Sequence, residues 1–417
     1  MKRLYHFFRA WAGSVGHGHP SKKIYVIGVT GTKGKTTVIE LLNAILETAG
    51  KKTALISSLR VKIGDENIKK QTDNSMPGRG YLQAMLEQAV DAGCNYAIIE
   101  ATSQGVVQFR HKFIEWNAGV WTNLSPEHIE SHGTFEKYRD AKIAFLRSVG
   151  EEGGRIFLNG DSEYTGFFAN ALRKFSPVTY SQNDEATARL IPRVSPARSA
   201  GDITSSPFLL SDFNKANIAA AVAVAKSVGV DEKTIEDALR HFKGVPGRME
   251  LLQQRPFSVV VDYAHTPDSL EVAYRSLRSA GDLISPKGRL IAVLGAAGGG
   301  RDKWKRPEMG KVAAKYCDEI ILTDEDPYNE NPETILEEIA SGFSRVVESM
   351  SHRPKFEKIL DRRTAIARAL ALAQPGDAVI MTGKGSEDSI HVARGKKISW
   401  NEREVAVQLL NDLRNGR

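Results

Sequence analysis

The chain has 417 residues, of which 41% are hydrophobic and 26% are charged, and its formal net charge is +7. A chain of this length usually folds as two or three domains rather than around one core. Residues 1–23 contain five basic residues and no acidic residue, so the rest of the chain carries only +2. This nearly neutral body argues against a nucleic-acid-binding surface spread over the fold, and it is compatible with a local basic pocket for an anionic substrate.

The cysteine content and the N-terminus place the chain among cytoplasmic proteins. Cys94 and Cys317 are its two cysteines, too few for a disulfide framework. No apolar stretch is long enough to span a bilayer, and the basic, aromatic N-terminus is too short and mixed for a signal peptide. We expect a short arm that packs on the body or frays. A weak membrane-surface contact is the alternative, because Leu4, Phe8 and Trp11 share one helical face.

Strands and helices alternate along the chain after this arm, which we take as residues 1–23. Strands are predicted at 23–31, 52–59, 96–102 and 118–125, and helices at 36–50, 80–93 and 214–230. This alternation predicts an α/β domain with a mainly parallel sheet over residues 24–243. The polar, proline-containing stretch 181–206 is predicted to be irregular or weakly β.

A second α/β pattern follows residues 244–250, whose two glycines and one proline predict a hinge. Strands are predicted at 257–265, 289–300, 319–327 and 377–385, and helices at 306–316 and 362–376. The predicted fold class is therefore α/β, with a P-loop ATPase-type parallel-sheet domain followed by a smaller Rossmann-like domain over residues 244–417. We expect a ligand to bind in the cleft between the two domains.

The turn GTKGKTT, residues 31–37, lies between the first predicted strand and the first predicted helix. Such a turn points backbone N–H groups at one spot, and the helix N-terminus and a lysine add positive charge. Lys35 would meet the β- and γ-phosphates, and the Thr36 hydroxyl would hold Mg²⁺. The spacing departs from the usual P-loop, because five residues separate Gly28 from Gly34. The strand–turn–helix context favours polyphosphate binding over a tight turn with an exposed lysine. The candidate phosphate-binding residues are Gly31, Thr32, Lys33, Gly34, Lys35, Thr36 and Thr37.

A phosphate loop alone does not separate a kinase, a GTPase and a ligase, so the downstream residues matter. Glu100 ends a buried run, and the segment 123–142 contains His128 and Lys142. Acidic residues at strand ends near a P-loop bind Mg²⁺. Read alone, His128 is a capped or core-edge histidine. Lys142 read alone lies on a solvated helix face, and an ammonium group does not bind a metal.

Seven motifs occur in the order in which they occur in Mur ligases: GVTGTKGKTT, NLSPEHIESHGTFEKYRDAK, FNKANIAAAVAVA, GVPGRME, DYAHTPDSL, GGRDKWKRPEMG and TGKGSED. The chain resembles this family from residue 24 to its C-terminus, and most closely the branch that adds the third amino acid of the peptidoglycan stem. The resemblance implies an ATP-dependent, ADP-forming amide-bond ligase. In such enzymes ATP phosphorylates a carboxylate, and the amine of an amino acid then attacks the acyl phosphate.

The resemblance also assigns roles to the residues around the phosphate loop. Lys35 and Thr36 would hold the phosphates and one Mg²⁺, and Glu100 and His128 match metal ligands of the family. Lys142 matches the lysine that reacts with CO₂ to give a carbamate, an anion whose two oxygens support Mg²⁺. This reaction requires the neutral amine and hence a lowered lysine pKa. The implied cofactors are ATP, Mg²⁺ and a carbamylated lysine.

Further matches concern the nucleotide. Asn214 and Asn217 match asparagines near the adenine, with helix capping as the alternative role. Arg248 matches an arginine that reaches the nucleotide phosphates from the second domain, and it completes the candidate catalytic set. Asp262 and His265 match a motif that closes on the nucleotide from the same side, although Asp262 alone reads as a turn residue after a strand. Domain closure would then exclude water from the acyl phosphate.

The amino-acid substrate is expected on the second domain. Arg301 would pair with its carboxylate and Glu387 with an ammonium group; otherwise these residues are a surface cation and a helix-start acid. Asp326 and Tyr328 replace the Asn and Arg of the Asp-Asn-Pro-Arg motif found in enzymes that add diaminopimelate. Asp324, Glu325 and Asp326 make this patch acidic, which suits a distal ammonium such as that of lysine. The candidate amino-acid site comprises Arg301, Asp324, Asp326, Tyr328 and Glu387.

The acceptor side departs most from the family pattern. The family has an N-terminal domain that holds the uridine nucleotide, whereas about twenty residues precede the first strand here. The UDP-sugar is then recognised otherwise, the substrate lacks UDP, or the chain is incomplete. Gln104 stands where the family usually has His, and residues 72–78 replace a Thr-Thr-Pro-like run.

The expected function is a cytoplasmic, monomeric ligase that adds L-lysine or meso-diaminopimelate to a UDP-N-acetylmuramoyl-L-alanyl-D-glutamate-like acceptor. Its partners would be the nucleotide-sugar peptide and the amino acid, without nucleic acid or a transmembrane segment. A folylpolyglutamate synthase-like ligase, or another Mur-like ligase with a non-UDP acceptor, is the near alternative. A P-loop kinase would show no amino-acid-dependent ADP release, and a non-catalytic partner would bind ATP without turnover.

Overall fold

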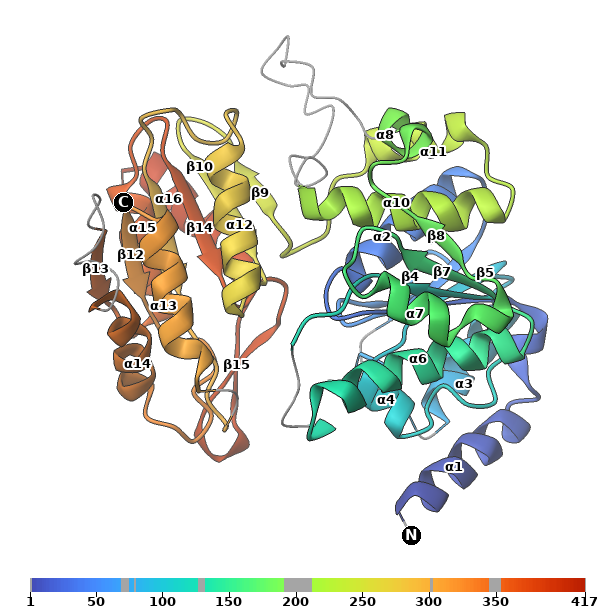
Figure 1. Cartoon of the computed structure of the whole chain (residues 1–417). Helices are drawn as coiled ribbons and strands as arrows, with labels where there is room; N and C mark the ends of the chain where they lie inside the picture. The colour runs from blue at the N-terminus through green and yellow to red at the C-terminus, as the bar shows by residue number, and fades with distance from the viewer. Residues whose placement is uncertain are drawn as a thin grey trace. The chain divides into compact units, whose positions relative to one another are not determined.

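The computed structural model describes residues 2–68, 75–78, 80–126, 132–190, 212–300, 303–344 and 354–416. The chain divides into two compact units, one ending at Lys243 and the other starting at Gly244 (Figure 1). We call these unit 1 and unit 2. Each is built on its own mainly parallel sheet, and the predicted α/β class is therefore confirmed.

Unit 1 contains an eight-stranded sheet with the order β4-β3-β2-β5-β1-β6-β7-β8. All neighbouring strands from β2 to β8 in this order are parallel, whereas β3 and β4 pair antiparallel. The strands are β1 Tyr25–Thr30, β2 Thr53–Ile56, β3 Val61–Ile63, β4 Glu66–Ile68, β5 Tyr96–Glu100, β6 Ala118–Trp121, β7 Arg155–Asn159 and β8 Val178–Tyr180. Because β1 lies between β5 and β6, the carboxyl ends of these three strands meet at one edge.

Helices cover both faces of this sheet. In Figure 1, α2, α10 and α11 lie on one face, and α3, α4 and α6 lie on the other. The helices of unit 1 are α1 Lys2–Gly16, α2 Lys35–Thr48, α3 Tyr81–Asp91, α4 Ser103–Val107, α6 Phe135–Glu151, α7 Thr165–Ala171, α8 Glu185–Leu190, α10 Asp212–Ser227 and α11 Glu232–His241, with the 3₁₀ turns η1 Pro20–Lys23 and η2 Arg173–Phe175. Because helices cover both faces of the parallel sheet, neither face of β1 meets solvent, and the strand is buried along nearly its whole length. In the stretch predicted to be irregular, α8 is helical, and residues 191–211 lie outside the described residues.

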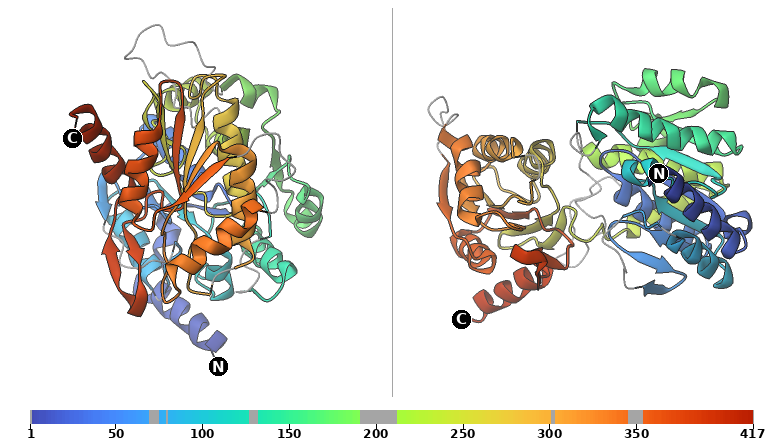
Figure 2. Two further views of the ribbon diagram at one scale, coloured as in Figure 1. Left: turned by 90° about the vertical axis from the view of Figure 1, so that its left-hand side faces the viewer. Right: turned by 90° about the horizontal axis from the view of Figure 1, so that it is seen from below.

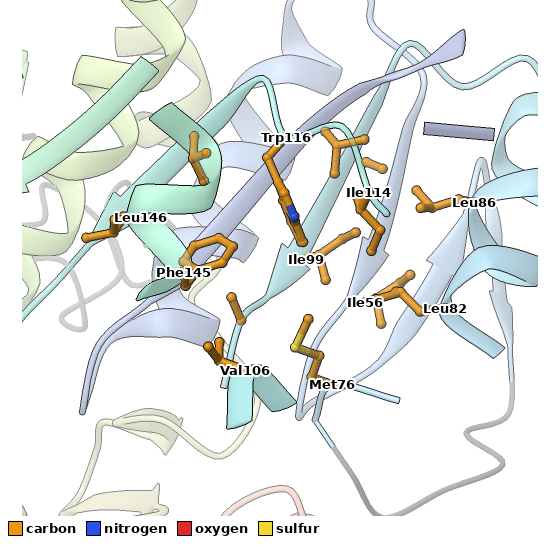
Figure 3. Packing of buried hydrophobic residues seen from close by; sticks show 14 of the residues in the cluster. Ile56, Met76, Leu82, Leu86, Ile99, Val106, Ile114, Trp116, Phe145 and Leu146 are labelled. Carbon is orange, nitrogen blue, oxygen red and sulfur yellow. The ribbon is translucent and has the colours of Figure 1, made fainter. Parts of the chain in front are cut away.

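The core between the sheet and α3, α4 and α6 is packed around Trp116 (Figure 3). The Trp116 ring meets Phe145 edge-on at 5.0 Å between centroids, an arrangement worth about 1 kcal/mol beyond burial. The Trp116 indole N–H donates to the carbonyl oxygen of His111 at 2.9 Å. A Cβ at Gly28 would come within 2.3 Å of Phe145 and 2.8 Å of Trp116. The glycine in β1 therefore leaves room for the two rings.

Helix α1 docks on the rest of unit 1 mainly by its C-terminal half, while its N-terminal end points away from the rest of the unit (Figures 1 and 2). Ser14 is fully buried and donates to the carbonyl oxygen of Phe113 at 3.1 Å. His17 lies 2.7 Å from Glu87 of α3. Of the two behaviours expected of the arm, packing on the body describes this half of the helix.

Unit 2 contains a six-stranded sheet with the order β13-β12-β11-β14-β10-β9, in which only β9 is antiparallel to its neighbour. Its strands are β9 Glu250–Gln253, β10 Ser258–Asp262, β11 Leu290–Leu294, β12 Glu319–Leu322, β13 Lys355–Lys358 and β14 Ala378–Thr382, and β15 Ser389–His391 and β16 Lys397–Ser399 form a separate hairpin. The helices are α12 Pro267–Ser279, α13 Lys305–Tyr316, α14 Pro332–Ser344, α15 Arg362–Leu372 and α16 Glu402–Arg414, with the 3₁₀ turn η4 Ala393–Gly395. A buried ion pair between Arg362 and Glu402, 2.5 Å between Nη2 and Oε1, joins α15 to α16.

Candidate active site

The turn between β1 and α2 requires glycine at two positions. Gly31 has φ +151° and Gly34 has φ +82°, conformations that favour glycine. A Cβ at Gly31 would lie 1.9 Å from the Thr122 hydroxyl, and a Cβ at Gly34 would lie 2.2 Å from the Asn217 amide oxygen. The turn is thus packed closely by the segment after β6 and by α10.

Side chains from two other elements fix the shape of this turn. The Lys33 N–H donates to the Asn123 amide oxygen at 2.8 Å, and the Asn123 amide group donates back to the Lys33 carbonyl oxygen at 3.0 Å. The Tyr138 hydroxyl, from α6, donates to the Thr32 hydroxyl oxygen at 3.0 Å. Since these bonds are made by the protein itself, the turn is preorganised, which would lower the entropic cost of binding the predicted polyphosphate.

Two lysines meet at the carbonyl oxygen of Gly31. Lys35 Nζ donates to it at 3.1 Å and lies 3.9 Å from Glu100 Oε1. Lys142 Nζ donates to the same oxygen at 2.8 Å and lies 4.1 Å from the centroid of the Tyr138 ring. Lys142 is only 1% exposed, so its reading as a solvated helix residue is wrong. It projects from the inner side of α6 toward the turn.

Oxygen atoms that suit Mg²⁺ lie beside these lysines. The Thr36 and Ser58 hydroxyl oxygens are 2.8 Å apart, and the Ser58 N–H donates to Glu100 Oε2 at 2.8 Å. Hydroxyl and carboxylate oxygens are the hard ligands that Mg²⁺ prefers. Within the described ranges, no group of three or more His, Cys, Asp or Glu residues could hold a metal ion. His128, the further predicted ligand, lies outside the described residues.

The two asparagines predicted to lie near the adenine are both buried on α10. The Asn217 amide group donates to the Asn214 amide oxygen at 3.0 Å. Because Asn217 also abuts Gly34, this pair lies directly against the start of α2. Helix capping alone does not account for that position.

In unit 2, the remaining predicted nucleotide residues gather at the end of β10. The Arg248 guanidinium lies over the Tyr263 ring, 4.2 Å from its centroid. The carboxylate of Asp262 accepts hydrogen bonds from the N–H groups of Met249 and Ala264, both at 2.7 Å. Asp262 thereby ties the turn that carries Arg248 to the end of the strand. His265 Nδ1 bonds the Tyr263 carbonyl oxygen at 2.8 Å.

A buried lysine links the acidic residues of unit 2. Lys384 is fully buried, with Nζ 2.9 Å from Asp326 Oδ1 and 2.6 Å from Glu387 Oε2. Burial alone would lower the pKa of Lys384, but the carboxylates of Glu387 and Asp326 outweigh it and raise this pKa. The Tyr263 hydroxyl donates to Glu387 Oε1 at 3.1 Å. The predicted acidic patch is thus partly neutralised from within.

Glu325 and Arg306 line a pocket beside this network, together with Tyr263, Lys305 and Glu387. Glu325 Oε2 and Arg306 Nε are buried and have no hydrogen-bond partner among the described residues. Burial raises the pKa of Glu325 to about 7. Glu325 and Arg306 are therefore the two residues lining this pocket that each have a buried side-chain polar atom without a hydrogen-bond partner in the described structure.

The other predicted amino-acid residues contribute differently. Asp324 accepts a hydrogen bond from the Glu325 N–H at 2.9 Å, and burial raises its pKa. Tyr328 has φ +51° and stacks on His391 with 5.1 Å between ring centroids. Arg301 lies outside the described residues.

Sequence reasoning did not single out several residues that shape the site, among them Ser58, Asn123 and Lys384. Each of these three lies two residues after the end of an observed strand, namely β2, β6 and β14. The carboxyl ends of the strands in an α/β sheet collect ligand-binding groups. Their position at strand ends was the signal in the sequence that could have identified them.

Comparison with known proteins identifies the family. Residues 29–225 match the Mur ligase middle domain, and residues 247–385 match the Mur ligase, glutamate ligase domain. The chain is 36% identical over 408 residues to the UDP-N-acetylmuramoyl-L-alanyl-D-glutamate–2,6-diaminopimelate ligase of Trichormus variabilis, covering 95% of this chain and 79% of that protein. The chain belongs to the Mur ligase family. The predicted family and the predicted class of ATP-dependent, ADP-forming ligase are confirmed.

Other relatives of this Mur ligase agree. It is 36% identical to the UDP-N-acetylmuramyl-tripeptide synthetase of Deinococcus radiodurans, covering 92% of this chain and 78% of that one. Among solved structures, a UDP-N-acetylmuramoyl-L-alanyl-D-glutamate–2,6-diaminopimelate ligase matches with a TM-score of 0.60 at 26% identity, covering 94% of this chain and 79% of that chain. Escherichia coli FolC in complex with DHPP and ADP matches with a TM-score of 0.67 at 18% identity, covering 98% and 93%. The FolC likeness shows a shared fold.

In the described part of the chain, every helix is too short or too polar to cross a membrane.

Proposed function

We propose that this Mur ligase uses ATP to join an amino acid, L-lysine or meso-diaminopimelate, to a UDP-N-acetylmuramoyl-L-alanyl-D-glutamate-like acceptor, releasing ADP and phosphate. The observation that carries this proposal is the meeting of Lys35 and Lys142 at the Gly31 carbonyl oxygen, with Glu100 beside them. A kinase needs the phosphate loop and one lysine, whereas the second, buried lysine is explained by the family's chemistry.

We propose that Thr36, Ser58 and Glu100 supply oxygen ligands to Mg²⁺, which neutralises charge on the phosphates when it is bound. In the carbamate proposal, the neutral Lys142 amine attacks the carbon of CO₂, and Nζ gives up one proton. The product keeps one N–H, which retains the hydrogen bond to Gly31. Its two oxygens then place negative charge beside the metal ligands, where the ammonium form would repel the ion.

We propose that the nucleotide is held by the phosphate turn, by Asn214 and Asn217, and by Arg248 with Asp262 and His265 from unit 2. Arg248 is held over Tyr263, which orients its guanidinium without neutralising it. A cation aimed at phosphate oxygens stabilises the charge that develops during phosphoryl transfer.

For the amino acid, we propose that the pocket beside Glu325 binds its ammonium group and that Arg306 Nε donates to its carboxylate. Glu325 Oε2 is an acceptor and Arg306 Nε a donor without a hydrogen-bond partner among the described residues, and an amino-acid zwitterion carries the complementary ammonium and carboxylate groups. Glu387 and Asp326, already bonded to Lys384, would position the bound substrate. Arg301, Asp324 and Tyr328 stay predictions for this site.

The test is an ADP- and phosphate-release assay with UDP-N-acetylmuramoyl-L-alanyl-D-glutamate and each candidate amino acid, lysine and diaminopimelate first. Parallel reactions omit the acceptor, omit the amino acid, or replace the pair with a folate and glutamate. We expect release only with acceptor and amino acid together. Release with folate and glutamate alone would overturn the proposal and indicate a folylpolyglutamate synthase-like ligase. Release without any amino acid would indicate a kinase.

A further inference from the structure

The docked face of α1 is separate from a second, exposed apolar face. Gly13 and Ser14 of α1, and His17 just after it, face the rest of unit 1. A Cβ at Gly13 would lie 2.8 Å from the Gly80 backbone, and Ser14 and His17 bond to Phe113 and Glu87. Phe7 adds edge-on ring contacts, 5.1 Å from Phe113 between centroids. This face holds the helix in place and needs no further partner.

The exposed face carries Phe8, Trp11 and Val15, which are 59%, 50% and 47% exposed. Their spacing of three and four residues places them in one stripe along the helix. Among the described residues, five of the fourteen exposed large hydrophobic side chains belong to this single helix of 15 residues. A stripe of this kind on a docked helix is poorly explained by folding, because the helix is already anchored through its other face.

The charge of the helix identifies a partner chemistry. Helix α1 contains Lys2, Arg3 and Arg9 and no acidic residue, and Arg9 is exposed. Lys22 and Lys23, in the following 3₁₀ turn, are exposed as well. Aromatic side chains beside basic ones are the composition of helices that lie in the headgroup region of an anionic membrane. Binding in the groove of a partner protein would need only the apolar stripe and would not require the basic residues.

We propose that α1 binds the surface of an anionic lipid bilayer, with Phe8, Trp11 and Val15 inserted between the headgroups and the basic residues paired with lipid phosphates. The N-terminal end of α1 points away from the rest of unit 1, so the stripe reaches a surface without unfolding the domain. The Mur ligase would then work at the membrane as a peripheral protein. This proposal is independent of which amino acid is added.

The experiment is sedimentation of the full chain with vesicles of phosphatidylcholine alone or mixed with phosphatidylglycerol. We expect binding to the mixed vesicles that weakens with added salt, and little binding to phosphatidylcholine. The variant Phe8→Asp/Trp11→Asp should reduce the partition coefficient at least about tenfold. The matched control Val178→Asp/Ile398→Asp changes two other exposed apolar residues and should bind as the unchanged chain does.

Circular dichroism and the ligase assay on the same samples establish that the variants are folded. Equal binding of Phe8→Asp/Trp11→Asp and the unchanged chain would overturn the proposal, and so would a failure of the unchanged chain to bind mixed vesicles at low salt. If light scattering instead shows a dimer that the same variant converts to a monomer, without vesicle binding, the stripe belongs to a second copy of this chain and the lipid proposal is wrong.

Discussion

Lys142 shows how much a single buried amine constrains the chemistry. An ammonium group is costly to bury unless it is paired or hydrogen-bonded, and Lys142 rests on a carbonyl oxygen and beside a tyrosine ring. Both contacts keep Lys142 Nζ at the turn between β1 and α2, where the carbamate proposal requires it.

We therefore predict that Lys142→Ala lowers turnover roughly 100-fold, as loss of a group that orients a metal does. Lys142→Arg should fail as badly, because arginine keeps the charge and cannot form the carbamate. Phosphate release measures both. Lys137→Ala, at an exposed lysine on the same helix, is the matched control.

A readout independent of activity is the carbamate carbon itself. With ¹³C-bicarbonate, the unchanged chain should show a carbamate resonance that both Lys142 variants lose. Added bicarbonate should not restore turnover in Lys142→Ala. Full activity in that variant would remove the carbamate from the mechanism.

Glu325 gives a prediction about pH and stability. Burial raises its pKa from 4.5 to about 7. Below pH 4.5 the carboxyl group is neutral in both folded and unfolded chains. Between pH 4.5 and 7 the unfolded chain releases the proton while the folded chain keeps it, so the free energy of unfolding falls by up to about 3 kcal/mol as pH rises.

Glu325→Gln should flatten this dependence, because the amide does not titrate. Urea unfolding at pH 4.5 and pH 8 measures it, and Glu333→Gln at an exposed position of α14 is the control. An unchanged slope in Glu325→Gln would mean that the carboxyl group is solvated or paired in the folded chain.

At the scale of elements, the turn between β1 and α2, the predicted phosphate turn, is held by three separate elements. Asn123 follows β6, Tyr138 lies on α6 and Asn217 on α10. None of these is near the turn in sequence. The contacts that hold the turn therefore come from distant parts of the chain.

This arrangement predicts different outcomes for two glycines. Gly34 and Gly50 both have positive φ, +82° and +71°, but a Cβ at Gly34 would meet Asn217 whereas a Cβ at Gly50 would meet nothing within 4 Å. Gly34→Ala should weaken ATP binding at least about tenfold. Gly50→Ala should lower only the stability of the fold, by the backbone strain of about 1 kcal/mol. Fluorescent-nucleotide titration and thermal melting separate the two effects. Equal ATP affinity in both variants would show that the Asn217 contact has no role in nucleotide binding.

At the scale of the whole molecule, the two units contain different groups of the proposed site. Unit 1 contains the phosphate turn and both lysines, and unit 2 contains Arg248 and the pocket beside Glu325. In the proposed mechanism both sets of groups are needed, since an acyl phosphate formed without the amine close by would be lost to water.

We predict that Arg248→Ala lowers kcat roughly 100-fold while ATP affinity changes much less, because a cation directed at the transferring phosphoryl group acts mainly in the transition state. Steady-state kinetics and nucleotide titration on one preparation measure both quantities. Arg275→Ala, at an exposed arginine of unit 2, is the control. An unchanged kcat would assign Arg248 to packing on Tyr263.

The sequence by itself determined the α/β class, the predicted phosphate turn and the family. Strand periodicity, glycine spacing and short motifs involve only neighbouring residues, so they can be read directly from the sequence. It did not determine that Lys142 is buried, that Ser58 and Asn123 reach the turn, or that Lys384 neutralises Asp326 and Glu387. Those facts depend on which strand ends share an edge and which helix face turns inward. Burial and pairing arise from contacts between residues far apart in the chain, so only the tertiary structure decided them.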